Sequence, residues 1–127
     1  MTMLVAYDGR KNTEKALDHA IGESILHKEK LYILSVIPRG SESQEDIDNT
    51  HSFADAALAK AKEAGADAHV LVESGQPDTE ILNAAARFRC STIFVGRSGK
   101  TSIDRVIMGS VSNSIVANAN CTVVVVQ

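Results

Sequence analysis

The segment from Gly96 to Ser110 holds the residues of this chain whose types and spacing suit chemistry on an anion. Glycines lack a Cβ atom and let backbone N–H groups turn toward one negative group, and Ser98 adds a hydroxyl donor. A helix that begins near Gly109 would direct its unpaired N–H groups and the positive end of its dipole to the same place. These features favour a phosphate-binding site, and an ordinary glycine-rich loop is the alternative from the residues alone.

The run Gly99-Lys100-Thr101 imitates the end of a P-loop, but a true P-loop is excluded. That motif needs an earlier glycine at the position where Phe94 stands inside an apolar run. The chain after Thr101 is also too short for the strand that carries the Mg²⁺-binding aspartate of a P-loop enzyme.

The elements that must position this segment follow from the apolar pattern. Short apolar runs bounded by turn residues predict five strands, over residues 3–7, 31–37, 68–72, 92–95 and 121–126. Apolar residues at helical spacing predict four helices, over residues 13–28, 47–64, 77–88 and from 109 onward, and the polar stretch 40–46 is expected to be a loop. Strands that alternate with helices predict an α/β fold, a parallel sheet with helices on both faces, because parallel neighbours need long crossovers.

Ligands of open parallel sheets bind beyond the carboxyl ends of the strands, so the residues that follow each strand are candidates. Asp8 and Gly9 follow the first predicted strand, Ile37 and Pro38 end the second, and Gly96 follows the fourth. Two roles stay open for Asp8: contact with a ligand, or capping of the following turn or helix.

Composition excludes several classes of protein. With 127 residues, of which 44% are hydrophobic and 23% charged, we expect one compact domain over residues 1–127. A net charge of −3, with 4% aromatic residues and no Trp, argues against nucleic-acid binding. No apolar run approaches the roughly 20 residues that span a bilayer, so we expect a soluble cytoplasmic protein without membrane contact. Cys90 and Cys121 form no C-x-x-C pair and are expected to be small packing residues, and the histidines lack metal-ligand spacing.

The spacing of Gly96, Gly99, Gly109 and Ser110 resembles the G-x2-G-x9-G-[ST] nucleotide motif of the ATP-binding branch of the universal stress protein family. Residues 5–9, Val-Ala-Tyr-Asp-Gly, are similar to the opening strand of that family. The segment from residue 95 to residue 126 is similar to its closing β-loop-α-β unit, and the likeness covers the chain in length and in order of elements.

The resemblance implies an open, Rossmann-like five-stranded sheet ordered 3-2-1-4-5. It also implies that Asp8 and the nearby backbone meet the ribose and adenine, that the main chain at Val36 reads the adenine edge, and that the glycines line the ribose and phosphates. The implied ATP-binding residues are Ala6, Tyr7, Asp8, Val36, Gly96, Arg97, Ser98, Gly99, Gly109, Ser110, Val111 and Ser112.

The implied cofactor is ATP, with ADP and AMP as alternatives, together with Mg²⁺ or Mn²⁺. No carboxylate cluster offers a cage for a hard cation, so a divalent ion would be held by the phosphates and water rather than by protein side chains.

Two residues depart from the family pattern. Arg10 stands where the family often has Ser, and Thr122 stands where it often has Pro. Neither touches the three-glycine motif, so nucleotide binding is still expected. Arg10 adds a cation near the carboxyl end of the first predicted strand. Its side chain would either attract the phosphates of a ligand or remain in water.

The function implied by the resemblance is that of a nucleotide-dependent regulatory module in the stress response, acting on an unidentified partner. The alternative is a slow ATPase or self-phosphorylating enzyme with Ser98, Ser110 or Ser112 as acceptor. No histidine or carboxylate pair near the motif would serve as general base, so the regulatory role is preferred.

The final predicted strand, residues 121–126, is apolar at nearly every position and lies at the edge of the implied sheet. Its free backbone groups could pair with a second copy around a two-fold axis, and the resemblance also implies a homodimer. A covered edge in a monomer is the alternative.

Overall fold

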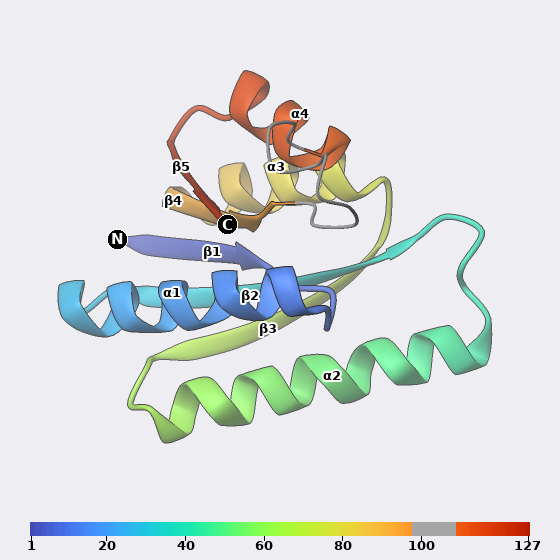
Figure 1. Cartoon of the computed structure of the whole chain (residues 1–127), viewed down its shortest axis with the longest axis horizontal. Helices are drawn as coiled ribbons and strands as arrows, with labels where there is room; N and C mark the ends of the chain where they lie inside the picture. The colour runs from blue at the N-terminus through green and yellow to red at the C-terminus, as the bar shows by residue number, and fades with distance from the viewer. Residues whose placement is uncertain (98–108) are drawn as a thin grey trace.

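The computed structural model describes residues 1–97 and 109–127, and it forms one parallel sheet whose strands are ordered β3-β2-β1-β4-β5 (Figure 1). The strands are β1 (Thr2–Ala6), β2 (Lys30–Pro38), β3 (Ala68–Gly75), β4 (Cys90–Gly96) and β5 (Thr122–Val126). The helices are α1 (Lys11–His27), α2 (Gln44–Glu63), α3 (Pro77–Arg87) and α4 (Ser110–Asn118). The predicted fold class and strand order are confirmed.

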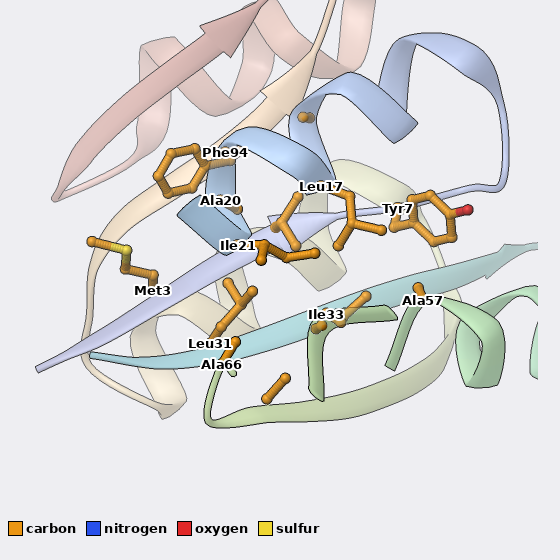
Figure 2. Close-up of a cluster of buried hydrophobic side chains, with 14 residues drawn as sticks. Met3, Tyr7, Leu17, Ala20, Ile21, Leu31, Ile33, Ala57, Ala66 and Phe94 are labelled. Carbon is orange, nitrogen blue, oxygen red and sulfur yellow. The ribbon is translucent and has the colours of Figure 1, made fainter. Parts of the chain in front are cut away.

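Helices cover both faces of the sheet, with α1 and α2 on one face and α3 and α4 on the other. The first face holds a cluster of buried side chains that includes Leu17, Ile33 and Phe94 (Figure 2). The second face holds another cluster, around Leu4 and Ile93. Because strand residues alternate between the two clusters, the central strand β1 is buried on both sides, as its uninterrupted apolar run predicted.

Most element bounds agree with the sequence prediction, and the differences have local causes. Strand β3 extends to Gly75 rather than residue 72, because its backbone stays paired with β2 as far as Pro38 opposite Gly75. The side chains of Glu73 and Ser74 are polar, and an apolar pattern therefore could not reveal this extension.

Helix α2 begins earlier than predicted, so the prediction of a loop over residues 40–46 is wrong for its last three residues. Ser43 is the N-cap, and its hydroxyl accepts a hydrogen bond of 3.1 Å from the backbone N–H of Asp46. The acidic residues Glu45 and Asp46 lie in the first turn, where they interact favourably with the helix dipole. The polar composition of this stretch is thus that of a capped helix start.

Among the helices within residues 1–97 and 109–127, none combines the length and the apolar content needed to cross a membrane.

Candidate functional site

A cavity of about 310 Å³ lies at the carboxyl ends of β1, β2 and β4, where the sheet order predicts a ligand site. The N-terminal ends of α1, α3 and α4 complete its walls. The described residues that line it are Ala6, Tyr7, Asp8, Arg10, Asn12, Thr13, Leu34, Val36, Pro38, Pro77, Ile81, Val95, Gly96, Gly109, Ser110, Val111 and Ser112.

Most of the predicted site residues meet at this cavity. The lining includes Ala6, Tyr7, Asp8, Val36, Gly96, Gly109, Ser110, Val111 and Ser112. Arg97 is not among the described lining residues; its backbone N–H donates to the Val126 carbonyl at 2.9 Å and so ties β4 to β5. Ser98 and Gly99, like Lys100 and Arg105, lie outside the residues that the structure describes.

Gly96 brings the end of β4 against the start of α1. A Cβ atom at this position would lie 2.7 Å from the backbone oxygen of Asn12, far inside van der Waals contact. The Asn12 side chain donates a 3.0 Å hydrogen bond to the Arg97 carbonyl and holds the two segments together. The glycine therefore has a packing role in addition to its place in the cavity wall.

Asp8 caps the turn that leads into α1. Its Oδ1 atom accepts hydrogen bonds from the Arg10 N–H at 3.0 Å and from the Thr13 hydroxyl at 2.7 Å. The Asp8 N–H also lies 3.2 Å from Thr13 Oγ1. The capping role left open by the sequence is thus present, and the half-exposed carboxylate still faces the cavity.

Arg10 lies at the mouth of the cavity with a side chain that is 70% exposed. Its Nε atom is 4.0 Å from Asp8 Oδ2, a loose contact that contributes little to stability at this exposure. A flexible cation at this place remains able to meet a negatively charged ligand.

The first turn of α4 directs backbone donors at the cavity. Gly109 is its N-cap without a side-chain cap, and the first helical hydrogen bond runs from the Asn113 N–H to the Gly109 carbonyl. The N–H groups of residues 110–112 therefore have no partner within the helix. The buried Ser112 hydroxyl donates to the Gly96 carbonyl at 3.0 Å and anchors this turn to β4.

Helices α3 and α4 are joined at the same end of the sheet. Ser114 donates a 2.7 Å hydrogen bond to Asp78 Oδ2 in the first turn of α3. This hydrogen bond lowers the pKa of Asp78, so the carboxylate form is favoured. The contact fixes Pro77, which lines the cavity, relative to the first turn of α4.

Tyr7 connects the cavity with the other face of the sheet. Its hydroxyl donates to Glu14 Oε2 at 2.6 Å, and Lys60 of α2 donates to Glu14 Oε1 at 2.9 Å. Burial and then the hydrogen bond to Glu14 raise the pKa of Tyr7 above its ordinary value. The Tyr7 carbonyl accepts a 2.8 Å bond from the Ser35 hydroxyl. The phenol thus links the end of β1 to α1 and α2, while Tyr7 is also among the residues that line the cavity.

The comparison with family models decides the family. The model of the universal stress protein family matches residues 1–127. A relative from Staphylococcus aureus (strain USA300) that is named for this family is 32% identical over 137 residues, covering 98% of this chain and 82% of the relative. The chain belongs to the universal stress protein family.

Solved structures of this family share the fold. A universal stress protein from Archaeoglobus fulgidus has a TM-score of 0.89 at 21% identity, covering 100% of this chain and 98% of that one. The structure of the Archaeoglobus fulgidus protein in complex with dAMP has a TM-score of 0.83 at 21% identity, covering 100% and 98%. A family protein from Arabidopsis thaliana with AMP bound has a TM-score of 0.75 at 19% identity, covering 99% and 90%.

Sequence reasoning missed part of the cavity wall of this universal stress protein. The missed residues are Asn12, Thr13, Leu34, Pro77, Ile81 and Val95, whereas Arg10 and Pro38 were noted without being assigned a contact. Strand β3 lies at the edge of the sheet, but the helix that follows it, α3, crosses back over the other face and reaches the cavity. The start of that helix at Pro77 was a usable signal, because helix N-termini gather at the carboxyl edge of such sheets.

A second cavity of about 390 Å³ lies at the opposite end of the sheet of this universal stress protein. Cys90 and Cys121 line it, together with residues from the C-terminal ends of α3 and α4. Burial raises the pKa of the Cys90 thiol to about 11, so the neutral thiol predominates at neutral pH. Helix N-termini and strand carboxyl ends are the features that suit an anionic ligand, and they surround the first cavity.

Proposed function

We propose that this universal stress protein binds an adenine nucleotide, ATP or else ADP or AMP, in the cavity at the carboxyl ends of β1, β2 and β4. The observation that carries the proposal is the position of that cavity, which α4 faces with the free N–H groups of its first turn. Proteins of the same fold with bound dAMP and AMP support the choice of an adenine nucleotide.

The lining divides into an apolar part and a polar part, as a nucleotide requires. Leu34, Ile81 and Val95 belong to the buried cluster on the α3–α4 face, and Val36 packs against it. Such a surface suits the flat face of adenine. The polar part contains Asp8, which we assign to the ribose, and it suits the sugar and the phosphates.

We assign the phosphates to Gly109, Ser110, Val111 and Ser112, whose backbone lies in the first turn of α4. Ala6 and Tyr7 would contact the nucleoside through their backbone, and Val36 would read the adenine edge. Gly96, Arg97, Ser98 and Gly99 complete the proposed path of the ribose and phosphates. A divalent ion, Mg²⁺ or Mn²⁺, would be held by the phosphates and water.

The proposed role is regulatory: residues 1–127 act as one nucleotide-binding domain, in the cytoplasm, whose nucleotide state changes its contacts with a partner in stress adaptation. Asp8 is the one carboxylate among the described lining residues, and one of its oxygens is already bonded within the turn. A fast hydrolase would need a base free to activate water, whereas one Asp8 oxygen is bonded within the turn and the other is assigned to the ribose, so the wall described here suits binding better than turnover.

Nucleotide binding is tested by denaturing the purified protein, identifying any released nucleotide by chromatography, and titrating stripped protein with ATP and Mg²⁺ by calorimetry. Gly109→Val is expected to weaken ATP binding by about tenfold or more, since it places a branched side chain at the start of α4. The Gly109 backbone, with φ −62° and ψ 162°, lies in the extended region that valine readily adopts.

Gly22→Val is the matched control, because nothing lies within 4 Å of a Cβ atom at Gly22 on α1. It is expected to bind ATP like the parent. A folded Gly109→Val protein that binds ATP as tightly as the parent, or a parent that binds no adenine nucleotide at millimolar concentration, would refute the site.

A further inference from the structure

Thr13, in the first turn of α1, has a buried hydroxyl that is committed to Asp8. The side chain is only 8% exposed although it lines the cavity. Its Oγ1 atom lies 2.7 Å from Asp8 Oδ1, 3.2 Å from the Asp8 N–H donor and 3.1 Å from the Arg10 carbonyl. A hydroxyl has a single proton to donate. The shortest of these contacts is the one to the carboxylate, so we assign the proton to the hydrogen bond with Asp8 Oδ1.

These contacts distinguish the two oxygens of the Asp8 carboxylate. Oδ1 receives two donors, the Thr13 hydroxyl and the Arg10 N–H, and is thereby filled. Oδ2 has the 4.0 Å contact with Arg10 Nε as its one recorded interaction in the described part of the chain. An ionised carboxylate can accept at both oxygens, so Oδ2 retains its capacity to accept a hydrogen bond from a ligand.

Rotation of the carboxylate is also restricted. An Asp8 side chain without the Thr13 hydroxyl would keep only the Arg10 N–H donor at Oδ1 and would turn more easily, because it is about half exposed. Holding one oxygen in place removes this freedom before a ligand arrives, and binding then costs less side-chain entropy. A donor on the ligand that reaches Oδ2 gains a charge-assisted hydrogen bond.

We propose that Thr13 is a positioning residue that aims Asp8 Oδ2 at a sugar hydroxyl, so that the site selects nucleotides whose sugar carries a free 2′- or 3′-hydroxyl. This inference rests on the proposed nucleotide site and specifies its ligand class. A nucleotide that lacks both hydroxyls leaves Oδ2 without a donor in the bound state, where a desolvated and unpaired carboxylate oxygen is costly.

The test compares the dissociation constants of ATP and 2′,3′-dideoxy-ATP, each with Mg²⁺, for the full chain. The parent protein is expected to bind the dideoxy compound about tenfold more weakly, a moderate ratio because Asp8 is half exposed. Thr13→Val keeps the shape of the side chain and removes the hydroxyl, and it is expected to lower this ratio below about threefold. Thr13→Ser restores the hydroxyl and is expected to restore the ratio.

Thr50→Val provides the matched control. Thr50 is 7% exposed, and its hydroxyl donates to the Asp46 carbonyl at 2.8 Å within α2, outside the described cavity lining. The variant is expected to lose some thermal stability and to keep the full ratio. A merely structural role for Thr13 would likewise lower stability and leave the ratio unchanged.

Asp8→Asn keeps the inference testable if Thr13→Val does not fold. The amide oxygen takes the two donors of Oδ1, and the amide nitrogen replaces Oδ2, so the charge-assisted hydrogen bond to the sugar is lost and the ratio is expected to fall below about threefold. Equal binding of both nucleotides by the parent, or an undiminished ratio in a folded Thr13→Val or Asp8→Asn protein, would overturn the inference alone. A parent that binds neither nucleotide would overturn the proposed function as well.

Discussion

Gly96 and Asp8 each have a structural role in addition to their predicted place in the ligand site. Gly96 was predicted as part of a nucleotide motif, and the structure adds a close approach between its Cα and the backbone of α1. Asp8 was left between two roles, and its hydrogen bonds show the capping role while its position keeps the other open. The Gly96 contact joins segments far apart in the chain, which no local pattern contains, whereas the hydrogen-bond partners of Asp8 lie within five residues of it.

Gly96→Ala is predicted to destabilise the protein by about 1–3 kcal/mol, because the new Cβ atom would meet backbone rather than a flexible side chain. The measurement is the free energy of unfolding in urea. Gly22→Ala is the control, since its Cβ enters open space on α1 and is expected to stabilise the helix by about 0.5–1 kcal/mol. A Gly96→Ala protein as stable as the parent would show that α1 can move away from β4 without cost.

At the scale of elements, the apolar pattern predicted every strand and helix of the described chain, and it failed where polar residues belong to an element. The early start of α2 depends on the Ser43 cap, and the extension of β3 depends on backbone pairing with β2. Neither feature needs apolar side chains. The role of α3 in the cavity was missed because it depends on how a helix crosses the sheet, which a periodic pattern does not specify.

Helices α1 and α2 are joined by a charged group that gives stability a pH dependence. The hydrogen bond from Tyr7, followed by that from Lys60, lowers the pKa of Glu14 from its ordinary value of 4.5. Because the folded pKa is the lower one, the ionised form contributes stability above the unfolded value, and this contribution is lost as the pH falls through the folded value. Glu14 is therefore a source of acid sensitivity in the packing of these helices.

Glu14→Gln is predicted to reduce the free energy of unfolding at pH 7 by at most about 1 kcal/mol, a small value because the Lys60 and Glu14 side chains are 43% and 40% exposed. The difference between variant and parent should shrink as the pH falls below 4.5. Urea unfolding at several pH values measures both quantities. A difference that stays constant down to strongly acidic pH would show that the ionisation of Glu14 is not its source.

At the scale of the whole molecule, the strand order came from the family resemblance rather than from periodicity. Alternating strands and helices require a parallel sheet, but several strand orders satisfy that requirement equally well. The observed order places the ends of β1 and β4 side by side and leaves β3 and β5 as edges. Among the strands of residues 1–97 and 109–127, the same order thus creates the cavity at one place and a backbone edge without a paired strand at another.

The outer edge of β5 is predicted to join two copies of the chain, which pair through this strand. The side chains of Val123 and Val125 pack against one core cluster and those of Val124 and Val126 against the other, so β5 is fixed in place although none of the four is fully buried. A fixed, apolar edge strand with free N–H and C=O groups is a template for another strand, and pairing around a two-fold axis satisfies both edges at once.

Sedimentation equilibrium is expected to give twice the chain mass of 13.6 kDa at micromolar concentration. Thr122→Lys places a charge at an exposed position of this edge strand and is expected to shift the protein toward the single-chain mass, because an isolated charge at a strand interface is costly to bury. The matched control Ala59→Lys adds the same charge to an exposed position of α2, on the part of the sheet around β2 and β3, and is expected to leave the mass unchanged. A parent protein of single-chain mass at all concentrations would mean that β5 remains an open edge, and a dimer insensitive to Thr122→Lys would place the contact elsewhere.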